Sequence, residues 1–321
     1  MQRKTFLRAA AATVAGAFAV PLLAQSWPAR PVRVIIPFPP GGTLDAVGRM
    51  LAQKLGEQLG QTFVVENRPG GNGVIGADAV AKAAADGHTL LFNASTFTSA
   101  PMTMKQVPYS VERDFAPIAM VAKAPLSVAV HKNLPITDIR SLVAYARSKG
   151  DRMTFATGSI GSAGHLATEL LARAGDFRYT IVPYKGTAPA MQDLIGGQVD
   201  VFIDPILGSL QQHRTGLLRV VGVTSAARVP NLPEVPPVAD SIPGYEFHSW
   251  YGLWAPVKLP DEIRQRLNAE ANKALASDMR ERLTQQGLIV TAGSIDDFVR
   301  FQRDDMARSL KLITEGNIRL E

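Results

Sequence analysis

Apolar runs alternate with amphipathic stretches along most of this chain, a pattern typical of an α/β protein. Val32–Phe38 is an almost continuous β-branched run, as expected for a strand buried on both faces of a parallel sheet. Leu44–Leu59 then repeats Leu and Val at helical spacing, and Gly60 is a typical helix stop. Further strands are expected at 63–66 and 89–92, and a helix at 74–84. This order predicts a right-handed, mostly parallel α/β unit.

The same alternation restarts in the middle of the chain. Two strand-like runs, Ile118–Val121 and Leu126–Val130, are separated by Ala122–Pro125. A proline-rich loop is expected at 235–245, and Ser294 resembles the cap of a long C-terminal helix. The other expected helices are 138–149, 162–174, 187–195 and 261–277, and the other expected strands are 153–156, 180–182, 199–203, 218–223 and 247–255.

This order predicts two lobes. The segment 123–226 forms an α/β lobe inserted into another lobe made of residues 27–122 and 227–321. The chain then crosses twice between the lobes, an arrangement that suits hinge closure around a ligand.

The first 26 residues have the features of an export signal. Met1–Arg8 carries three basic residues and no acid, and Ala9–Leu23 is an uncharged, largely apolar run of 15 residues. Ala24–Ser26 offers the small residues of a cleavage site. The apolar run is shorter than the ~20 residues needed to span a bilayer. We therefore expect residues 1–26 to be a signal peptide and the mature protein to be exported.

Composition narrows the possible functions. Hydrophobic residues make up 46% of the chain and charged residues 19%, which is enough apolar material for two packed cores. The absence of cysteine excludes disulfides, Cys-ligated metals and a cysteine nucleophile. The net charge is +6, but three basic residues belong to the first 26, which leaves 31 basic against 28 acidic groups. No block of Lys and Arg follows, so nucleic acid is not an expected partner.

The candidate chemistry lies where strands end and helices begin. In the stretch from Phe38 to Asp45, two glycines and a helix start would expose backbone N–H groups to a ligand. The alternative is a tight turn in which Asp45 serves only the helix dipole. Thr157–Ser162 offers a similar loop with small hydroxyl residues, although Ser162 can equally act only as an N-cap. His165 either faces this site or packs inside its lobe.

A third helix start follows Tyr184, and Lys185 either supplies a cation or is solvated. Asp204 ends a strand and either contacts a ligand or caps the next segment, and Ser95 follows another strand end. Several helix N-termini facing one cleft favour a small anion, most simply a carboxylate. The predicted binding residues are Phe38, Pro40, Gly41, Gly42, Thr43, Asp45, Ser95, Ser159, Gly161, Ser162, His165, Tyr184, Lys185, Gly186, Thr187 and Asp204.

Signatures of other chemistry are missing. Gly71–Gly76 matches G-x-G-x-x-G, but it does not directly follow a strand and no acid lies about 20 residues further on, so a nucleotide is not expected. There is no nucleophile elbow, no Walker loop, and no zinc-site spacing among the five His. We therefore predict no catalytic residue, metal or cofactor.

A set of colinear motifs also carries a family resemblance. The chain resembles the Bug-type extracytoplasmic solute receptors of tripartite tricarboxylate transporters over nearly all of its mature length. The motifs are Trp27–Arg33, Pro37–Asp45, Val65–Gly71, Asp86–Leu91, Asp114–Ile118, Gly161–Leu166 and Val182–Ala190.

The resemblance implies a fold and a site. The fold would be a two-lobed type II periplasmic binding protein, a Venus flytrap of mostly parallel sheets flanked by helices. Carboxylates would bind between the Pro40–Thr43 and Ser159–Ser162 loops, often through waters, with Ser95, Tyr184–Thr187 and Asp204 nearby. Aromatic residues would line the pocket or pack the hinge, namely Phe38, Phe97, Tyr184 and Trp250.

The resemblance also implies a role. The protein would be a periplasmic monomer that delivers a small carboxylate to an integral-membrane permease and performs no chemistry. Two other functions stay open from the sequence. One is an exported hydrolase or lyase that uses His165, Lys185 and Asp204 in the same cleft, and the other is a ligand sensor for a membrane kinase.

Overall fold

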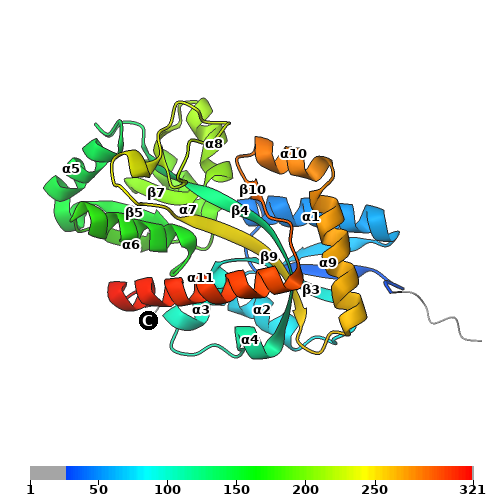
Figure 1. The fold of residues 1–321 in the computed structure, drawn as a ribbon. Helices are drawn as coiled ribbons and strands as arrows, with labels where there is room; N and C mark the ends of the chain where they lie inside the picture. Colours follow the sequence, from blue (N-terminus) through cyan, green and yellow to red (C-terminus); the bar gives the residue numbers. More distant parts are fainter. Residues whose placement is uncertain (1–26, 320–321) are drawn as a thin grey trace, which may run out of the picture.

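The computed structural model describes residues 27–319 (Figure 1). The predicted signal peptide, residues 1–26, lies outside the described residues. Within the described part of the chain, no helix is long and apolar enough to cross a membrane.

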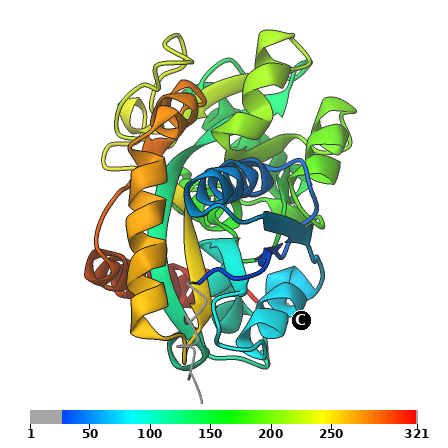
Figure 2. The same ribbon diagram turned by 90° about the vertical axis from the view of Figure 1, so that its right-hand side faces the viewer.

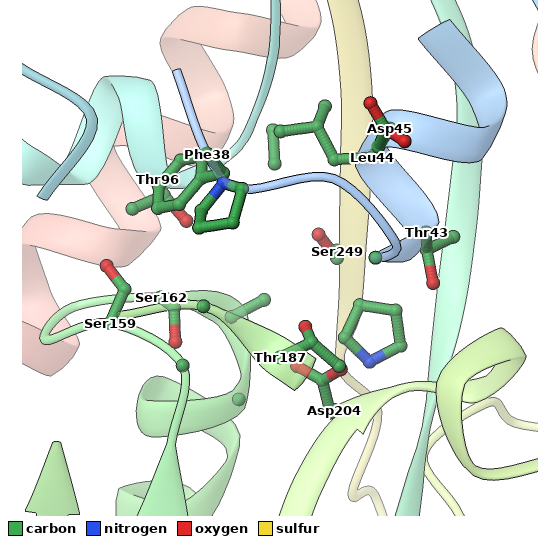
Figure 3. Close-up of a pocket in the computed structure, with 18 of the residues that line it drawn as sticks. Phe38, Thr43, Leu44, Asp45, Thr96, Ser159, Ser162, Thr187, Asp204 and Ser249 are labelled. Carbon is green, nitrogen blue, oxygen red and sulfur yellow. The ribbon is translucent and has the colours of Figure 1, made fainter. Parts of the chain in front are cut away.

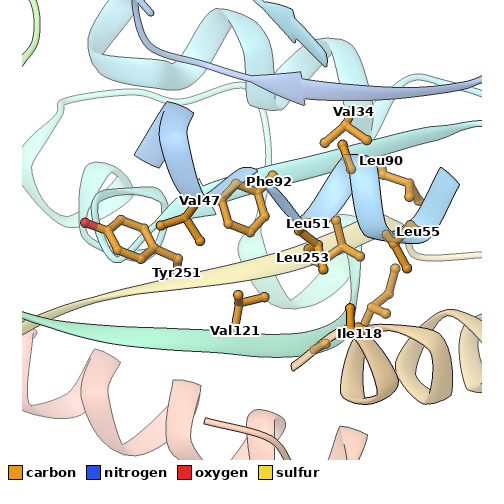
Figure 4. Packing of buried hydrophobic residues seen from close by; sticks show 14 of the residues in the cluster. Val34, Val47, Leu51, Leu55, Leu90, Phe92, Ile118, Val121, Tyr251 and Leu253 are labelled. Atoms are coloured by element: carbon orange, nitrogen blue, oxygen red, sulfur yellow. The ribbon is translucent and has the colours of Figure 1, made fainter. Parts of the chain in front are cut away.

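One half of the molecule is built around strand β1 (Val32–Ile36), which pairs in parallel with β2 (Phe63–Asn67) and β3 (Thr89–Ala94). Helix α1 (Thr43–Leu59) lies on this sheet, and Gly60 ends it in the left-handed conformation. Figure 4 shows the apolar face of α1 packed against strand residues such as Val34, Leu90, Phe92 and Leu253. The predicted order of the first half is therefore confirmed. The helices α2 (Val74–Ala81) and α9 (Asp261–Leu275) complete this half.

The other half has the same construction. Strand β5 (Thr154–Thr157) pairs in parallel with β6 (Thr180–Pro183) and with β7 (Val201–Pro205). Strand β8 is Leu218–Val223, and the helices are α5 (Ile139–Lys149), α6 (Ala163–Gly175), α7 (Thr187–Ile195) and α8 (Ile206–Arg214). These elements lie together in the left-hand part of Figure 1 and in the upper part of Figure 2.

Two long strands run through both halves. Strand β4 (Phe115–His131) pairs antiparallel with β9 (His248–Pro256), and the sheet order is β2-β1-β3-β9-β4-β7-β5-β6. The prediction of two strands interrupted at Ala122–Pro125 was wrong, because β4 is continuous through these residues. Most residues of β4 are buried and none is exposed. Register shifts near Pro117 and Met120 keep the strand paired with β9. The parallel strands thus lie outside and the antiparallel crossing strands lie between them.

Residues beyond 226 also contribute to the cores of the second half. Apolar side chains in and around the proline-rich loop pack there, namely Val229, Leu232, Val235, Val238, Tyr245 and Phe247. The chain therefore returns to the first half along β9. Helix α11 (Ile295–Gly316) begins with the predicted Ser294 capping box and contributes Phe298 to one core and Ile313 to another, so it spans both halves.

Several short elements were not predicted. They are α3 (Thr96–Thr103), α4 (Val111–Asp114), α10 (Asp278–Gln285), β10 (Ile289–Val290) and the 3₁₀ helices η1 (Gly71–Gly73), η2 (Gly150–Arg152) and η3 (Val238–Asp240), together with α8. Helix α3 is rich in Thr and Ser and contains Pro101, which are poor helix formers. It forms because Phe97 and Ala100 are buried against the neighbouring core.

Candidate functional site

A pocket lies between the two halves, at the ends of the strands and the starts of three helices (Figure 3). It encloses about 700 Å³, its open mouth included. Ten predicted binding residues line it, namely Phe38, Pro40, Gly42, Thr43, Asp45, Ser159, Ser162, Gly186, Thr187 and Asp204. The convergence of loops from distant parts of the sequence on one cleft is thus present in the structure.

The electrostatics of the pocket come mainly from helix ends. Thr43 begins α1, Ala163 begins α6 and Thr187 begins α7, and all three residues line the cavity. Helix N-termini carry partial positive charge and free N–H groups. Among the described residues that line this pocket there is no Lys or Arg. The arrangement suits an anion held by backbone donors rather than by side-chain cations.

The loop before α1 is fixed by a hydrogen-bond network around Asp45. The Asp45 carboxylate accepts from Gly41 N (3.2 Å), Arg49 Nε (3.0 Å) and Asn67 Nδ2 (2.8 Å), and Asn67 also donates to the Phe38 carbonyl (3.0 Å). Burial alone would raise the pKa of Asp45, but these hydrogen bonds outweigh burial and lower it. Asp45 is therefore an ionised anchor for the loop, and Gly41 adopts the left-handed conformation that this turn requires.

The loop before α6 is fixed in a similar way. The Ser162 hydroxyl caps the helix by accepting from His165 N (3.4 Å), and His165 Nδ1 accepts from Gly161 N (3.1 Å). The His165 ring is 4% exposed and does not line the pocket. Burial lowers the pKa of His165 to about 4, so at neutral pH the ring is an uncharged acceptor that holds the loop.

Asn72 joins the two halves directly beside this loop. Its Nδ2 donates to the Ile160 carbonyl (2.9 Å), and the Ser159 hydroxyl donates to its Oδ1. Ser99 of α3 adds a third connection by donating to the Gly161 carbonyl (2.7 Å). The Ser159 side chain, predicted to contact ligand, is thus engaged with the opposite half while still lining the pocket.

The inner end of the pocket holds buried polar atoms without hydrogen-bond partners. Among the described residues these include Thr43 Oγ1, Asp204 Oδ2 and Tyr251 Oη. Burial raises the pKa of Asp204 to about 8, and the Thr187 hydroxyl opposes this shift only in part. Figure 3 shows Asp204 and Thr187 facing the cavity from the second half, with Thr43 and Ser249 across from them.

Six predicted residues do not line this pocket. Ser95 and Gly161 border a small neighbouring cavity, while Tyr184 and Lys185 border an outer opening beside Asn72. Gly41 and His165 support the loops as described above. The remaining two proposed aromatic positions, Phe97 and Trp250, are buried in a core. His165, Lys185 and Asp204, grouped in the hydrolase alternative, do not share a cavity.

Sequence reasoning missed Asn67, Asn72, Ser249 and Tyr251. The two Asn lie in the Asn67–Gly73 stretch, where Gly and Pro indicated only a turn. Asn72 has a positive φ of 57°, which is acceptable for Asn. Its place between Gly71 and Gly73 was a sequence signal for a tight turn, but not for a contact with the opposite half. Ser249 and Tyr251 belong to β9, and only pairing of β9 with β3 and β4 brings them to the pocket.

No metal centre is evident in the part of the chain that the structure describes. Residues 27–319 contain no group of three or more His, Asp or Glu side chains arranged to hold an ion.

Two α/β halves, two crossing strands and a pocket between the halves define the class of two-lobed solute-binding proteins. The chain belongs to one family within it, the tripartite tricarboxylate transporter receptors, whose family model matches residues 47–318.

Solved structures support the assignment. Rpa4515 from R. palustris, solved with adipate, is 35% identical, with a TM-score of 0.89 over 91% of this chain and 99% of that one. The periplasmic binding protein BugD is 33% identical, with a TM-score of 0.86 over 92% and 100% of the two chains. MatC from Rhodopseudomonas palustris, solved with malate, is 31% identical, with a TM-score of 0.83 over 89% and 100%.

Proposed function

We propose that this protein is a periplasmic solute receptor that binds a small carboxylate between its halves and delivers it to a tripartite tricarboxylate-type permease. The observation that carries the proposal is the convergence of three helix N-termini on a pocket whose described lining contains no Lys or Arg. Backbone N–H groups and helix dipoles favour a carboxylate there. The similar proteins solved with adipate and malate support this class of ligand.

Binding without chemistry is part of the proposal. His165 is uncharged and buried, and Lys185 lies at a different opening, so the pocket does not assemble the acid–base set of the hydrolase alternative. A thermal-shift screen of di- and tricarboxylates, amino acids and aromatic acids tests this point. A ligand at 100 times its Kd stabilises the folded state by ~2.7 kcal/mol. Turnover of a carboxylate ester or acid, with no carboxylate shifting the melting curve, would contradict the proposal.

Export and delivery need separate experiments. We expect the protein recovered from the periplasmic fraction to begin at Trp27, as measured by intact mass. A precursor that keeps residues 1–26 in the cytoplasm would contradict export.

For delivery, we expect uptake of the bound carboxylate to stop when the receptor is deleted and to return with the intact gene. If uptake persists and only a transcriptional response is lost, the protein is instead a sensor.

A further inference from the structure

Asp204 is a buried carboxyl of the pocket that has no cation beside it among the described lining residues, and the Thr187 hydroxyl stabilises its charge only in part. It ends β7, is 8% exposed and lines the cavity, and its Oδ2 has no hydrogen-bond partner. In Figure 3 its carboxyl group lies beside Thr187, across the cavity from Thr43. No hydrogen bond from residues 27–319 occupies this oxygen, so it is available to a ligand.

The surroundings of Asp204 supply no compensating charge. Along the described pocket lining, which draws on α1, α3, α6, α7, β3, β7 and β9, the other titratable groups are Asp45 and Tyr251. Asp45 is held ionised by Arg49, and that pair is already satisfied. Burial raises the pKa of Tyr251, so it stays neutral. An ionised Asp204 would therefore be a buried charge without a counter-ion, which is a costly state.

We propose that Asp204 enters the complex as an uncharged carboxylic acid and donates a hydrogen bond to an oxygen of a ligand carboxylate. The ligand class is then a di- or polycarboxylate that carries no ammonium group at this end. This inference rests on the proposed carboxylate-binding function and specifies the role of one residue in it. The pKa of about 8 in the ligand-free pocket fits this role, because the acid form dominates at neutral pH.

A hydrogen-bonded acid makes ligand binding depend on pH. A ligand carboxylate placed beside Asp204 favours the protonated form further, so the complex keeps the proton. Above a pH of about 8 the free receptor has lost that proton, and binding must take one up from solvent. The affinity should be constant at neutral pH and fall by about tenfold for each pH unit above the pKa of Asp204. A ligand ammonium paired with ionised Asp204 would show the opposite proton exchange, namely release on binding.

The test is titration calorimetry of the whole mature receptor with four probes, adipate and malate and their amine-bearing counterparts 2-aminoadipate and aspartate. Binding is measured from about pH 6 to about pH 10 in buffers of different ionisation enthalpy. We expect adipate or malate to bind better than its amine-bearing counterpart, and nearly one proton to be taken up per ligand at the alkaline end.

The affinity of Asp204→Asn for the ligand should be within about threefold of wild type at neutral pH and should not depend on pH, because the amide still donates. Asp204→Ala should lose about tenfold or more.

Controls separate this inference from the function on which it rests. Asp296→Asn removes an exposed carboxylate on α11 and should leave both affinity and pH dependence unchanged. If none of the four probes binds and no acid of the thermal-shift screen shifts the melting curve, carboxylate binding itself is contradicted. If a dicarboxylate binds with pH-independent affinity, or an amine-bearing probe binds best and Asp204→Asn abolishes that binding, the acid role of Asp204 is overturned. The infrared carbonyl band of a protonated acid, present in free wild type at neutral pH and absent in Asp204→Asn, checks the protonation without any ligand.

Discussion

The Asn72 bridge between the halves should control how readily the receptor closes. Asn72→Gly removes the amide that donates to the Ile160 carbonyl and accepts from Ser159, and glycine readily adopts the left-handed φ of 57° found there. Each lost hydrogen bond costs ~0.5–1.5 kcal/mol, so the closed form should lose about 1–3 kcal/mol. That energy corresponds to a decrease of roughly 5- to 150-fold in the ratio of closed to open molecules.

The assay combines calorimetric affinity with small-angle scattering. If the closed form binds ligand, the apparent Kd rises as the closed fraction falls, and the free variant scatters as a more open molecule. Asn317→Gly is a matched control, because Asn317 has a φ of 49° at the end of α11 and takes no part in the bridge. Ser159→Ala combined with Asn72→Gly should cost less than the sum of the single variants. An Asn72→Gly variant with wild-type affinity and scattering would refute the bridge as a closing contact.

Two further substitutions test how the helix starts are positioned. Gly164→Ala should displace α6 or unfold the second half, because a Cβ at residue 164 would overlap the Ile203 carbonyl oxygen. We expect a loss of stability of about 2–4 kcal/mol in chemical denaturation, and unchanged stability would contradict this packing. His165→Gln tests the role of the neutral His165 ring below the second loop. The pKa of His165 is about 4 in the folded protein and 6.5 in model compounds, so the unfolded chain binds the proton first as the pH falls. The stability of wild type should therefore decrease by up to roughly 3 kcal/mol as the pH falls from 6.5 through 4. The Gln variant should lose less over the same range, and an identical acid profile for both proteins would contradict the role of His165.

Local patterns predicted most of the secondary structure and both principal loops. Hydrophobic periodicity located α1 and the parallel strands, because the spacing of the apolar residues in each element matches the face or faces that it buries. The same reasoning failed at Ala122–Pro125, where Pro and small residues resemble a break. There, pairing with β9 over a long buried stretch keeps β4 continuous, and this tertiary cause has no local signal.

The prediction of the binding site was incomplete for a similar reason. Gly42, Thr43, Ser162 and Thr187 were found because Gly and hydroxyl residues at helix starts have a local meaning. Which side chains support a loop and which face the cavity depends on contacts between segments far apart in the sequence. His165 illustrates this, since its helical position alone does not reveal that its ring accepts from Gly161.

We propose that a carboxylate binds between the loop at Gly42 and the helix starts of the opposite half. A Cβ at Gly42 would lie 3.7 Å from Thr187 Oγ1, an ordinary contact, so Gly42→Ala should fold and bind. The additional methyl groups of Gly42→Val would project into the space between the loop and α7 and displace the ligand. The most direct measurement is calorimetric titration of wild type, Gly42→Ala and Gly42→Val with adipate and malate. We expect one bound carboxylate per chain for wild type and for Gly42→Ala, and a loss of affinity of at least about tenfold for a folded Gly42→Val. Equal affinity in all three proteins would contradict it.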